Sequence, residues 1–333
     1  MKYSRLCLFA VLTMACLAAA AVPNAPVQDV RSGFVLVANQ QSANASLIDL
    51  RTDSMTLIDV GEGPHEAQIS PSGRVGVVTV YGTQTAGNQL AVIDITTRKL
   101  LRTISLGAYT RPHGVVFMPG DESRVVVTSE ATQLIVLVNL TEGKVENIIP
   151  TQAAGSHMVG VTADGKRAFT ANVGSGGVSE MDLAGNKHVR AISVAPRVEG
   201  IAVVPNGKEV WAGSNTNGTV SIIDVATGAI VDTLKGFSLP YRLAISADGR
   251  TAMICDPQAN KVHVADVAQR KVVWSLEGLG SPRGVNISPD GKTAFITLNS
   301  DRTVAVVDLA SRTIVRRIAV GASPDGVGFG RAF

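Results

Sequence analysis

Cysteine, aromatic residues and long runs of one charge are all scarce in this sequence. Three cysteines occur, and two of them, Cys7 and Cys16, lie in the first 21 residues. Cys255 then has no partner for an internal disulfide, so stability must come from a large apolar core. Aromatic residues make up only 4% of the chain, and no block of five like charges occurs. We therefore expect no nucleic-acid partner, because neither stacking platforms nor basic patches are indicated.

The first residues have the pattern of a secretory signal peptide. Lys2 and Arg5 precede an apolar stretch that ends in small residues at Ala21. We predict a signal peptide over residues 1–21 and a periplasmic or secreted protein. The alternative, a lipoprotein anchored at Cys16, is disfavoured because Thr-Met-Ala before this cysteine is a poor match. No later stretch reaches the ~18 apolar residues of a transmembrane helix.

An acidic or amide residue recurs at the end of a short apolar run along the chain. Successive gaps are 45, 45, 43, 42, 42 and 42 residues. The recurring residues are Asp49, Asp94, Asn139, Asp182, Asp224, Asp266 and Asp308. A period of ~40–45 residues is typical of β-propeller blades. We expect each of these side chains to hydrogen-bond the backbone of the turn that follows it.

One unit, residues 281–320, shows how four strands follow from the local sequence. Residues 281–288 form a first short strand, and Pro289-Asp-Gly-Lys292 has the composition of a turn. Two β-branched runs, 293–297 and 303–308, follow. Residues 313–320 alternate apolar with polar side chains, as a half-exposed outer strand does. The repeat therefore predicts four-stranded antiparallel blades.

The repeats predict an all-β fold, a seven-bladed β-propeller over residues 34–333. Residues 22–33 carry Pro23 and Pro26 with little pattern, and we expect a flexible lead-in there. The first ordered stretch begins with a second strand at Phe34, whereas the last repeat supplies only a first strand from Pro324. We predict that this C-terminal strand pairs with the N-terminal strands and closes the ring.

Two segments carry a family resemblance. The Tyr-Val-Thr-Asn repeat of β-propellers is resembled by residues 169–172 and 295–298. Turn residues precede both segments, and an apolar run that ends in Asp308 follows the second. The resemblance covers essentially the whole chain after residue 21. It implies the propeller fold and an exported protein. The family includes exported proteins of unassigned function, surface-layer proteins and propeller chains of periplasmic redox enzymes, and distant relatives include a sugar lactonase and an antibiotic-ring lyase.

Seven polar residues occupy one repeat position, directly after the start of each first strand. They are His65, His113, His157, Glu199, Tyr241, Arg283 and Asp325. First strands line the axis of a propeller, so these side chains should form a ring. Three of the five histidines of the chain fall on this position in consecutive blades. Three imidazoles meeting at one point are suited to Zn²⁺ or Cu²⁺.

The ring leaves three hypotheses open. In the first, a metal ion is bound by His65, His113 and His157. In the second, a small molecule or an anion binds at the channel mouth to Glu199, Tyr241, Arg283 and Asp325. In the third, the ring is a solvated polar surface without a ligand. Loops after the second strands add Tyr81, Glu130, Asn172, Asn215, Asp256 and Asn299 near the same mouth. Such loops often carry binding residues on a rigid scaffold.

No local catalytic motif is present, so we favour an exported binding or scaffold propeller without catalysis. The alternative is an enzyme at the channel mouth, a lactone hydrolase or metal-assisted lyase, with Glu199, His157 and Arg283 as its catalytic residues. A third hypothesis is a propeller subunit that binds a partner in a periplasmic redox or assembly complex. No haem-attachment motif occurs. We expect a monomer that binds a metal, a small molecule or a protein.

Overall fold

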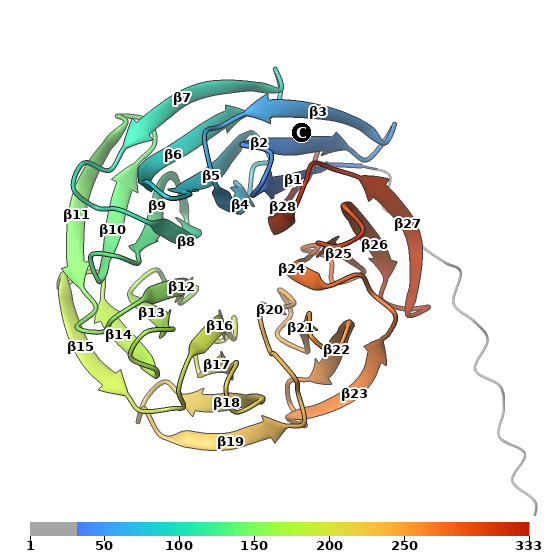
Figure 1. Ribbon diagram of the computed structural model, residues 1–333. Coiled ribbons are helices and arrows are strands. Elements are labelled where there is room, and N and C mark those ends of the chain that lie inside the picture. Colours follow the sequence, from blue (N-terminus) through green and yellow to red (C-terminus); the bar gives the residue numbers. More distant parts are fainter. Residues whose placement is uncertain (1–31, 333) are drawn as a thin grey trace, which may run out of the picture.

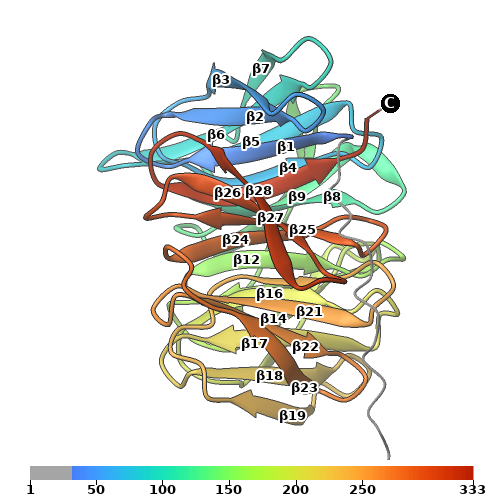
Figure 2. The ribbon, with the colours of Figure 1, turned by 90° about the vertical axis from the view of Figure 1, so that its right-hand side faces the viewer.

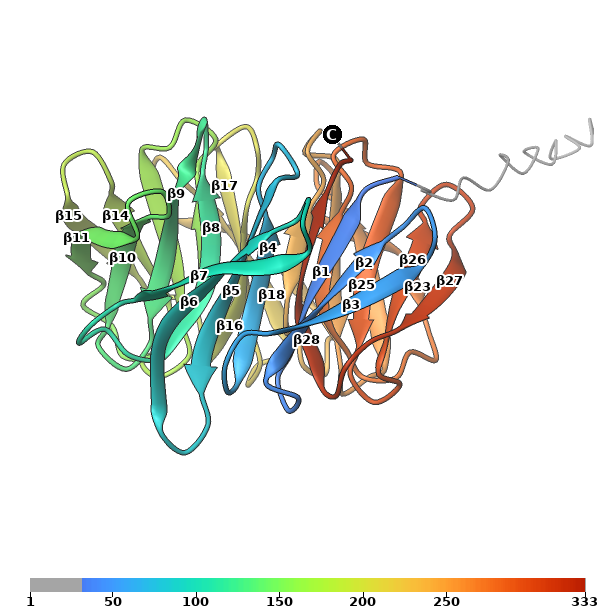
Figure 3. The ribbon, with the colours of Figure 1, turned by 90° about the horizontal axis from the view of Figure 1, so that it is seen from above.

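The computed structural model describes residues 32–332, and these form 28 strands in seven four-stranded sheets. The sheets stand as blades around one axis (Figure 1). Side views show a disc in which the blades stack around the ring (Figures 2 and 3). The predicted seven-bladed propeller is confirmed. The predicted signal peptide, its Cys16 alternative and most of the lead-in lie outside the described residues.

In six blades the strands run from the inner to the outer one in chain order, and the seventh blade takes its inner strand from the end of the chain. The inner strands are β4 (Pro64–Ile69), β8 (Pro112–Met118), β12 (Ser156–Val161), β16 (Val198–Val203), β20 (Leu243–Ile245), β24 (Pro282–Ile287) and β28 (Pro324–Gly330). The second strands are β5 (Val75–Gly82), β9 (Asp121–Ser129), β13 (Arg167–Asn172), β17 (Glu209–Ser214), β21 (Thr251–Asp256), β25 (Thr293–Leu298) and β1 (Phe34–Asn39).

The two remaining strands of each blade lie toward the rim. The third strands are β6 (Ala86–Asp94), β10 (Leu134–Asn139), β14 (Val178–Asp182), β18 (Thr219–Asp224), β22 (Lys261–Asp266), β26 (Thr303–Asp308) and β2 (Asn44–Asp49). The outer strands are β7 (Lys99–Ser105), β11 (Lys144–Pro150), β15 (Lys187–Ile192), β19 (Ile230–Lys235), β23 (Lys271–Leu276), β27 (Thr313–Ala319) and β3 (Ser54–Asp59).

The ring closes as predicted, because β28 pairs with β1 rather than with a strand near it in sequence. The two strands are antiparallel, with Phe34 opposite Gly330 and Val37 opposite Val327. Phe329 on β28 also stacks on Phe295 of the preceding blade, with ring centroids 4.9 Å apart. The C-terminal strand thus joins the first blade to the last.

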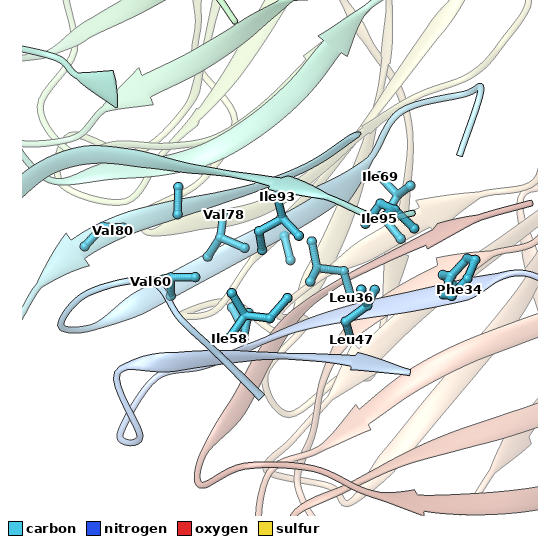
Figure 4. Close-up of a cluster of buried hydrophobic side chains, with 14 residues drawn as sticks. Phe34, Leu36, Leu47, Ile58, Val60, Ile69, Val78, Val80, Ile93 and Ile95 are labelled. Atoms are coloured by element: carbon cyan, nitrogen blue, oxygen red, sulfur yellow. The ribbon is translucent and has the colours of Figure 1, made fainter. Parts of the chain in front are cut away.

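Apolar side chains fill the spaces between neighbouring blades. One cluster joins the sheet of β1 and β2 to that of β5 and β6, and it includes Leu36, Leu47, Val78 and Ile93 (Figure 4). All six residues of β1 are buried, whereas most of β3 at the rim is exposed. This gradient from axis to rim agrees with the half-exposed outer strand expected from the sequence. Among residues 32–332, no helical segment has the length and apolar character that crossing a lipid bilayer requires.

The recurring acidic or amide residue caps the turn between the third and fourth strands, as predicted. Its side-chain oxygen accepts a hydrogen bond from a backbone N–H two or three residues later. The pairs are Asp49 with Arg51, Asp94 with Thr97, Asn139 with Glu142, Asp182 with Gly185, Asp224 with Thr227, Asp266 with Gln269 and Asp308 with Ser311. Asn139 shows that the position needs an oxygen acceptor and not a charge.

Phe295 tests the contribution of the closing blades to stability. Its side chain is fully buried, so Phe295→Ala should lower the free energy of unfolding by about 3–5 kcal/mol. Leu101→Ala is the matched control: Leu101 is 54% exposed, and its loss should change stability by less than about 0.5 kcal/mol. Equal losses in urea unfolding would contradict this packing.

Candidate functional site

The predicted ring of polar residues lies at the axis, and most of it is buried. His113 and Asp325 are fully inaccessible, while His65, His157 and Glu199 are 8%, 8% and 6% exposed. The inner strands that carry these residues surround the centre of the disc (Figure 1). The ring is therefore a compact polar core, not a solvated surface. Arg283 and Tyr241 are only partly buried.

Glycines on the inner strands, together with a hydrogen bond from a threonine side chain, bring these strands close enough to form this core. A Cβ atom on Gly326 would lie 2.5 Å from the Cα atom of Glu66, and one on Gly114 would lie 2.8 Å from that of Met158. Only glycine permits these approaches. Thr128 on β9 also donates a hydrogen bond to the backbone carbonyl of His157, at 2.6 Å, and so ties one blade to the next.

The three predicted histidines lie together in one stack. The ring of His113 lies between the other two, with centroids 4.1 Å from His65 and 3.6 Å from His157. Within the described chain, neither ring nitrogen of His113 has a hydrogen-bond partner. Burial is the main reason that the pKa of His113 lies well below its usual value, with His157 and His65 adding to the effect. His113 is therefore a neutral, buried imidazole with open nitrogens.

His157 differs from its neighbours because carboxylates hold both of its ring nitrogens. Nδ1 lies 2.7 Å from Glu130 Oε2, and Nε2 lies 2.7 Å from Glu199 Oε1. Burial opposes the charged form, but Glu199 and Glu130 outweigh it and raise the pKa of His157 to about 9. Burial likewise opposes ionisation of Glu199, but His157 and Arg242 lower its pKa to about 2. His157 is thus an imidazolium between two carboxylates.

Arg242 links opposite sides of the ring. Its Nε donates to Glu66 Oε1 at 2.9 Å, and its Nη1 donates to Glu199 Oε1 at 3.1 Å. Arg242 is 3% exposed and immediately precedes β20, whereas Glu66 lies on β4. Burial disfavours the charged form of Arg242, but nearby negative charges, of which Glu66 has the largest effect, raise the pKa of Arg242 well above its usual value. Burial raises the pKa of Glu66, and Arg242 opposes that rise.

His65 contacts a different set of groups. Its Nδ1 lies 3.2 Å from Asp325 Oδ2, and its Nε2 lies 2.9 Å from the side-chain nitrogen of Gln40. Because the amide nitrogen of Gln40 can only donate, Nε2 accepts this hydrogen bond and the proton of the neutral ring is on Nδ1, beside the carboxylate. Burial, opposed by Asp325, lowers the pKa of His65 to about 4. His65 is therefore neutral, with a defined acceptor nitrogen.

Arg283 and Tyr241 lie at the edge of this core. Arg283 Nη1 is 3.8 Å from Asp325 Oδ2, so the two residues are neighbours as expected. The guanidinium of Arg242 lies 4.3 Å from the centre of the Tyr241 ring, and that of Arg283 lies 5.9 Å from it. Burial raises the pKa of Tyr241, and Asp325 adds to the rise.

Only some of the predicted loop residues contribute to the core. Tyr81 donates to Glu130 Oε1 at 3.0 Å, and Asn215 donates to Glu199 Oε2 at 3.1 Å. Asp256 instead accepts the backbone N–H groups of Ser238 and Leu239. The remaining loop residues, Asn172 and Asn299, bond the hydroxyls of Ser179 and Ser323 respectively. Asn172 thus holds its own blade, whereas Asn299 links its blade to the start of β28, and neither bonds the three histidines.

The sequence predictions missed Glu66, Arg242 and Gln40. Glu66 and Arg242 occupy the same repeat position, one residue after the predicted ring. Four of the other copies of this position are glycine: Gly114, Gly200, Gly284 and Gly326. Charged residues at a position that is glycine in most blades could have been recognised from the sequence as candidate site residues. Gln40 directly follows the second strand β1, at the repeat position of Tyr81 and Glu130, and it contacts His65 of the next blade as Glu130 contacts His157.

Among residues 32–332, two groups have ligand atoms close enough to share a metal ion. One is His65, Glu66 and His113, and the other is His113, Glu130 and His157; within each, the atoms lie within 4.8 Å of one another. The second group has His157 already held by two carboxylates. The first has two neutral imidazoles and a carboxylate, the donor set that Zn²⁺ and Cu²⁺ accept. Its Glu66 Oε1 pairs with Arg242, and its His65 Nε2 accepts from Gln40.

The contacts of Glu199, His157 and Arg283, the predicted alternative catalytic residues, differ from those of an acid–base pair with an anion-binding arginine. Both oxygens of Glu199 accept hydrogen bonds, Oε1 from Arg242 and Oε2 from Asn215, while His157 also contacts Oε1. With a pKa of about 2, Glu199 is a weak proton acceptor. Arg283 lies beside Asp325 instead of facing Glu199. These contacts make Glu199 and His157 an ion pair that organises the core.

Comparisons with known proteins support the fold. Residues 241–330 match the family model of YNCE-like β-propellers. A solved structure titled Kuenenia stuttgartiensis Hydrazine Synthase superposes with a TM-score of 0.74 at 20% identity, covering 88% of this chain and 99% of that one. A total of 1753 chains of solved structures match, so the likeness shows the architecture and no particular function. No curated protein matches the sequence.

Arg242 provides a test of the ion network. Arg242→Ala leaves Glu66 and Glu199 buried without their shared cation, so the free energy of unfolding should fall by about 3–5 kcal/mol. Arg317→Ala is the control: Arg317 is 39% exposed and pairs with Asp301 at 3.0 Å, and its loss should cost less than about 1 kcal/mol. Similar losses for the two variants in urea unfolding would refute the network as described.

The raised pKa of His157 predicts the direction of a pH effect. Its stabilising contribution is complete below about pH 6.5, the unfolded value, and is lost as the pH rises through the folded value of about 9. The difference in unfolding free energy between wild type and His157→Gln should therefore shrink by roughly 1–3 kcal/mol between pH 6.5 and 9.5. Denaturant titrations at several pH values measure it. A constant or growing difference would show that His157 is not held as an imidazolium.

Proposed function

We propose that this protein is an exported, non-catalytic binding propeller that takes one divalent transition-metal ion, Zn²⁺ or Cu²⁺, at the mouth of its central channel. His65, Glu66 and His113 are its protein ligands. The proposal includes a periplasmic or secreted location, which rests on the sequence of residues 1–21. The other predicted members of the ring position these ligands and balance their charge.

The observation that carries the proposal is the state of His113. Its two ring nitrogens are buried and lack partners in the described chain. A buried polar group without a partner costs about 1–3 kcal/mol, and polar cores rarely keep one without a ligand or ordered water. A metal ion bound to His113 offsets this cost. Because burial keeps His65 and His113 neutral, binding requires no proton to leave either ring.

The surrounding charges also favour a cation. Four carboxylates face this core: Glu66, Glu130, Glu199 and Asp325. Arg242, the imidazolium of His157 and the partly exposed Arg283 are the cations that contact them. The contact between Asp325 and His65 also fits a carboxylate that orients a metal-binding histidine.

Metal titration of the mature protein tests the proposal. After treatment with a chelator, wild type should bind one equivalent of Zn²⁺ by calorimetry. His113→Ala should bind it at least about 100-fold more weakly, since even the outer partners of metal ligands contribute 10–100-fold. His188→Gln, an outer-strand change on β15, is the matched control and should bind like wild type. Equal affinity of wild type and His113→Ala would dispose of the site.

A further inference from the structure

A pocket of about 550 Å³ opens beside the histidine cluster, and the metal-binding proposal does not account for it. Its walls come from the loops of the first three blades. The lining residues that matter most are Gln40, Glu62, Tyr81 and Arg111. Figure 3 shows the turn between β5 and β6, which follows Tyr81, projecting from one face of the disc.

Gln40 and Tyr81 separate this pocket from the histidines. Gln40 donates its amide hydrogen bond to His65 Nε2. The Tyr81 ring packs edge-on against His65 and His113, with centroids 5.1 and 5.6 Å away. The acceptor nitrogen of His65 is therefore one side chain away from the pocket. An ion that took the place of Gln40 on this nitrogen would lie between the histidines and the pocket.

Arg111 is the cation of this pocket. Its guanidinium lies 4.7 Å from the centre of the Tyr81 ring, and the side chain is half-buried. The residue has φ of 58°, in the left-handed region. Residues with positive φ also precede five other inner strands: Gly63, Gly155, Arg197, Ser281 and Ser323. Because Arg197 shares this backbone conformation, what sets Arg111 apart is its place in the wall of the pocket.

From this geometry, and resting on the proposed metal site, we propose that the bound ion keeps an open coordination position toward the pocket. The ligand that fills this position is a small monocarboxylate. One carboxylate oxygen replaces a water molecule on the ion, and the carboxylate also pairs with the planar guanidinium of Arg111. Glu62 on the pocket wall disfavours a dianion such as phosphate. Gln40 releases His65 when the ion binds.

The test uses the mature protein loaded with Co²⁺, whose visible absorption reports the coordination of the ion. Acetate should change the spectrum of wild type saturably, whereas acetamide, of the same shape without charge, should not. Arg111→Gln should weaken the acetate effect about tenfold, as loss of a charge-assisted hydrogen bond does. Arg197→Gln is the matched control, because Arg197 has the same left-handed backbone, φ 51°, before β16. It should respond to acetate like wild type.

The outcomes separate this inference from the metal site itself. Failure of wild type to bind Co²⁺ overturns both. Stoichiometric Co²⁺ binding with a spectrum that acetate leaves unchanged overturns the open position alone. An equal acetate response in wild type and Arg111→Gln removes Arg111 as the anchor. Gln40→Ala, which frees His65 Nε2, should bind Co²⁺ at least as tightly as wild type; weaker binding would show that Gln40 does not compete with the ion.

Discussion

The close approach of seven inner strands around one axis is the constraint on which the rest of this structure depends. The strands meet closely enough that a single methyl group on Gly326 would strike the backbone of the neighbouring blade. Polar side chains from residues far apart in sequence are therefore forced into one buried core. Threonines such as Thr128 fix the backbone of the next blade, so the scaffold sets the positions of the histidines.

Burying so many ionisable groups is costly, and their pairing decides which of them carry charge. Arg242 and His157 remain cationic because carboxylates face them from other blades. His65 and His113 stay neutral because burial dominates. Replacing such groups with apolar residues often leaves a protein equally stable. The bare imidazole of His113 is the feature for which the proposed metal ion would account.

The fold was predictable from the sequence because it depends on local, repeated features. The period of the capping residues, the turns and the unmatched strands at Phe34 and Pro324 define seven blades and their closure. The position that carries His65, His113 and His157 was also visible, because each follows the start of an inner strand. These features need no knowledge of distant contacts.

The charge state of the core was not predictable in the same way. His157 is an imidazolium because Glu130 and Glu199 reach it from neighbouring blades. Arg242 stands at a repeat position that is glycine in four blades, but the repeat does not show that it pairs with Glu66 across the ring. Gln40 reaches His65 from the loop of the preceding blade. Such contacts depend on side-chain directions that a repeat pattern does not specify.

The most direct measurement is a crystal structure of the protein grown with Zn²⁺ and recorded at the zinc absorption edge. The account predicts one strong anomalous peak at the axis, within about 2.0–2.1 Å of a nitrogen of His65 and of His113, with Gln40 turned away from His65. A map without a peak at the axis, or with His65 still bonded to Gln40 and zinc bound elsewhere, would contradict it.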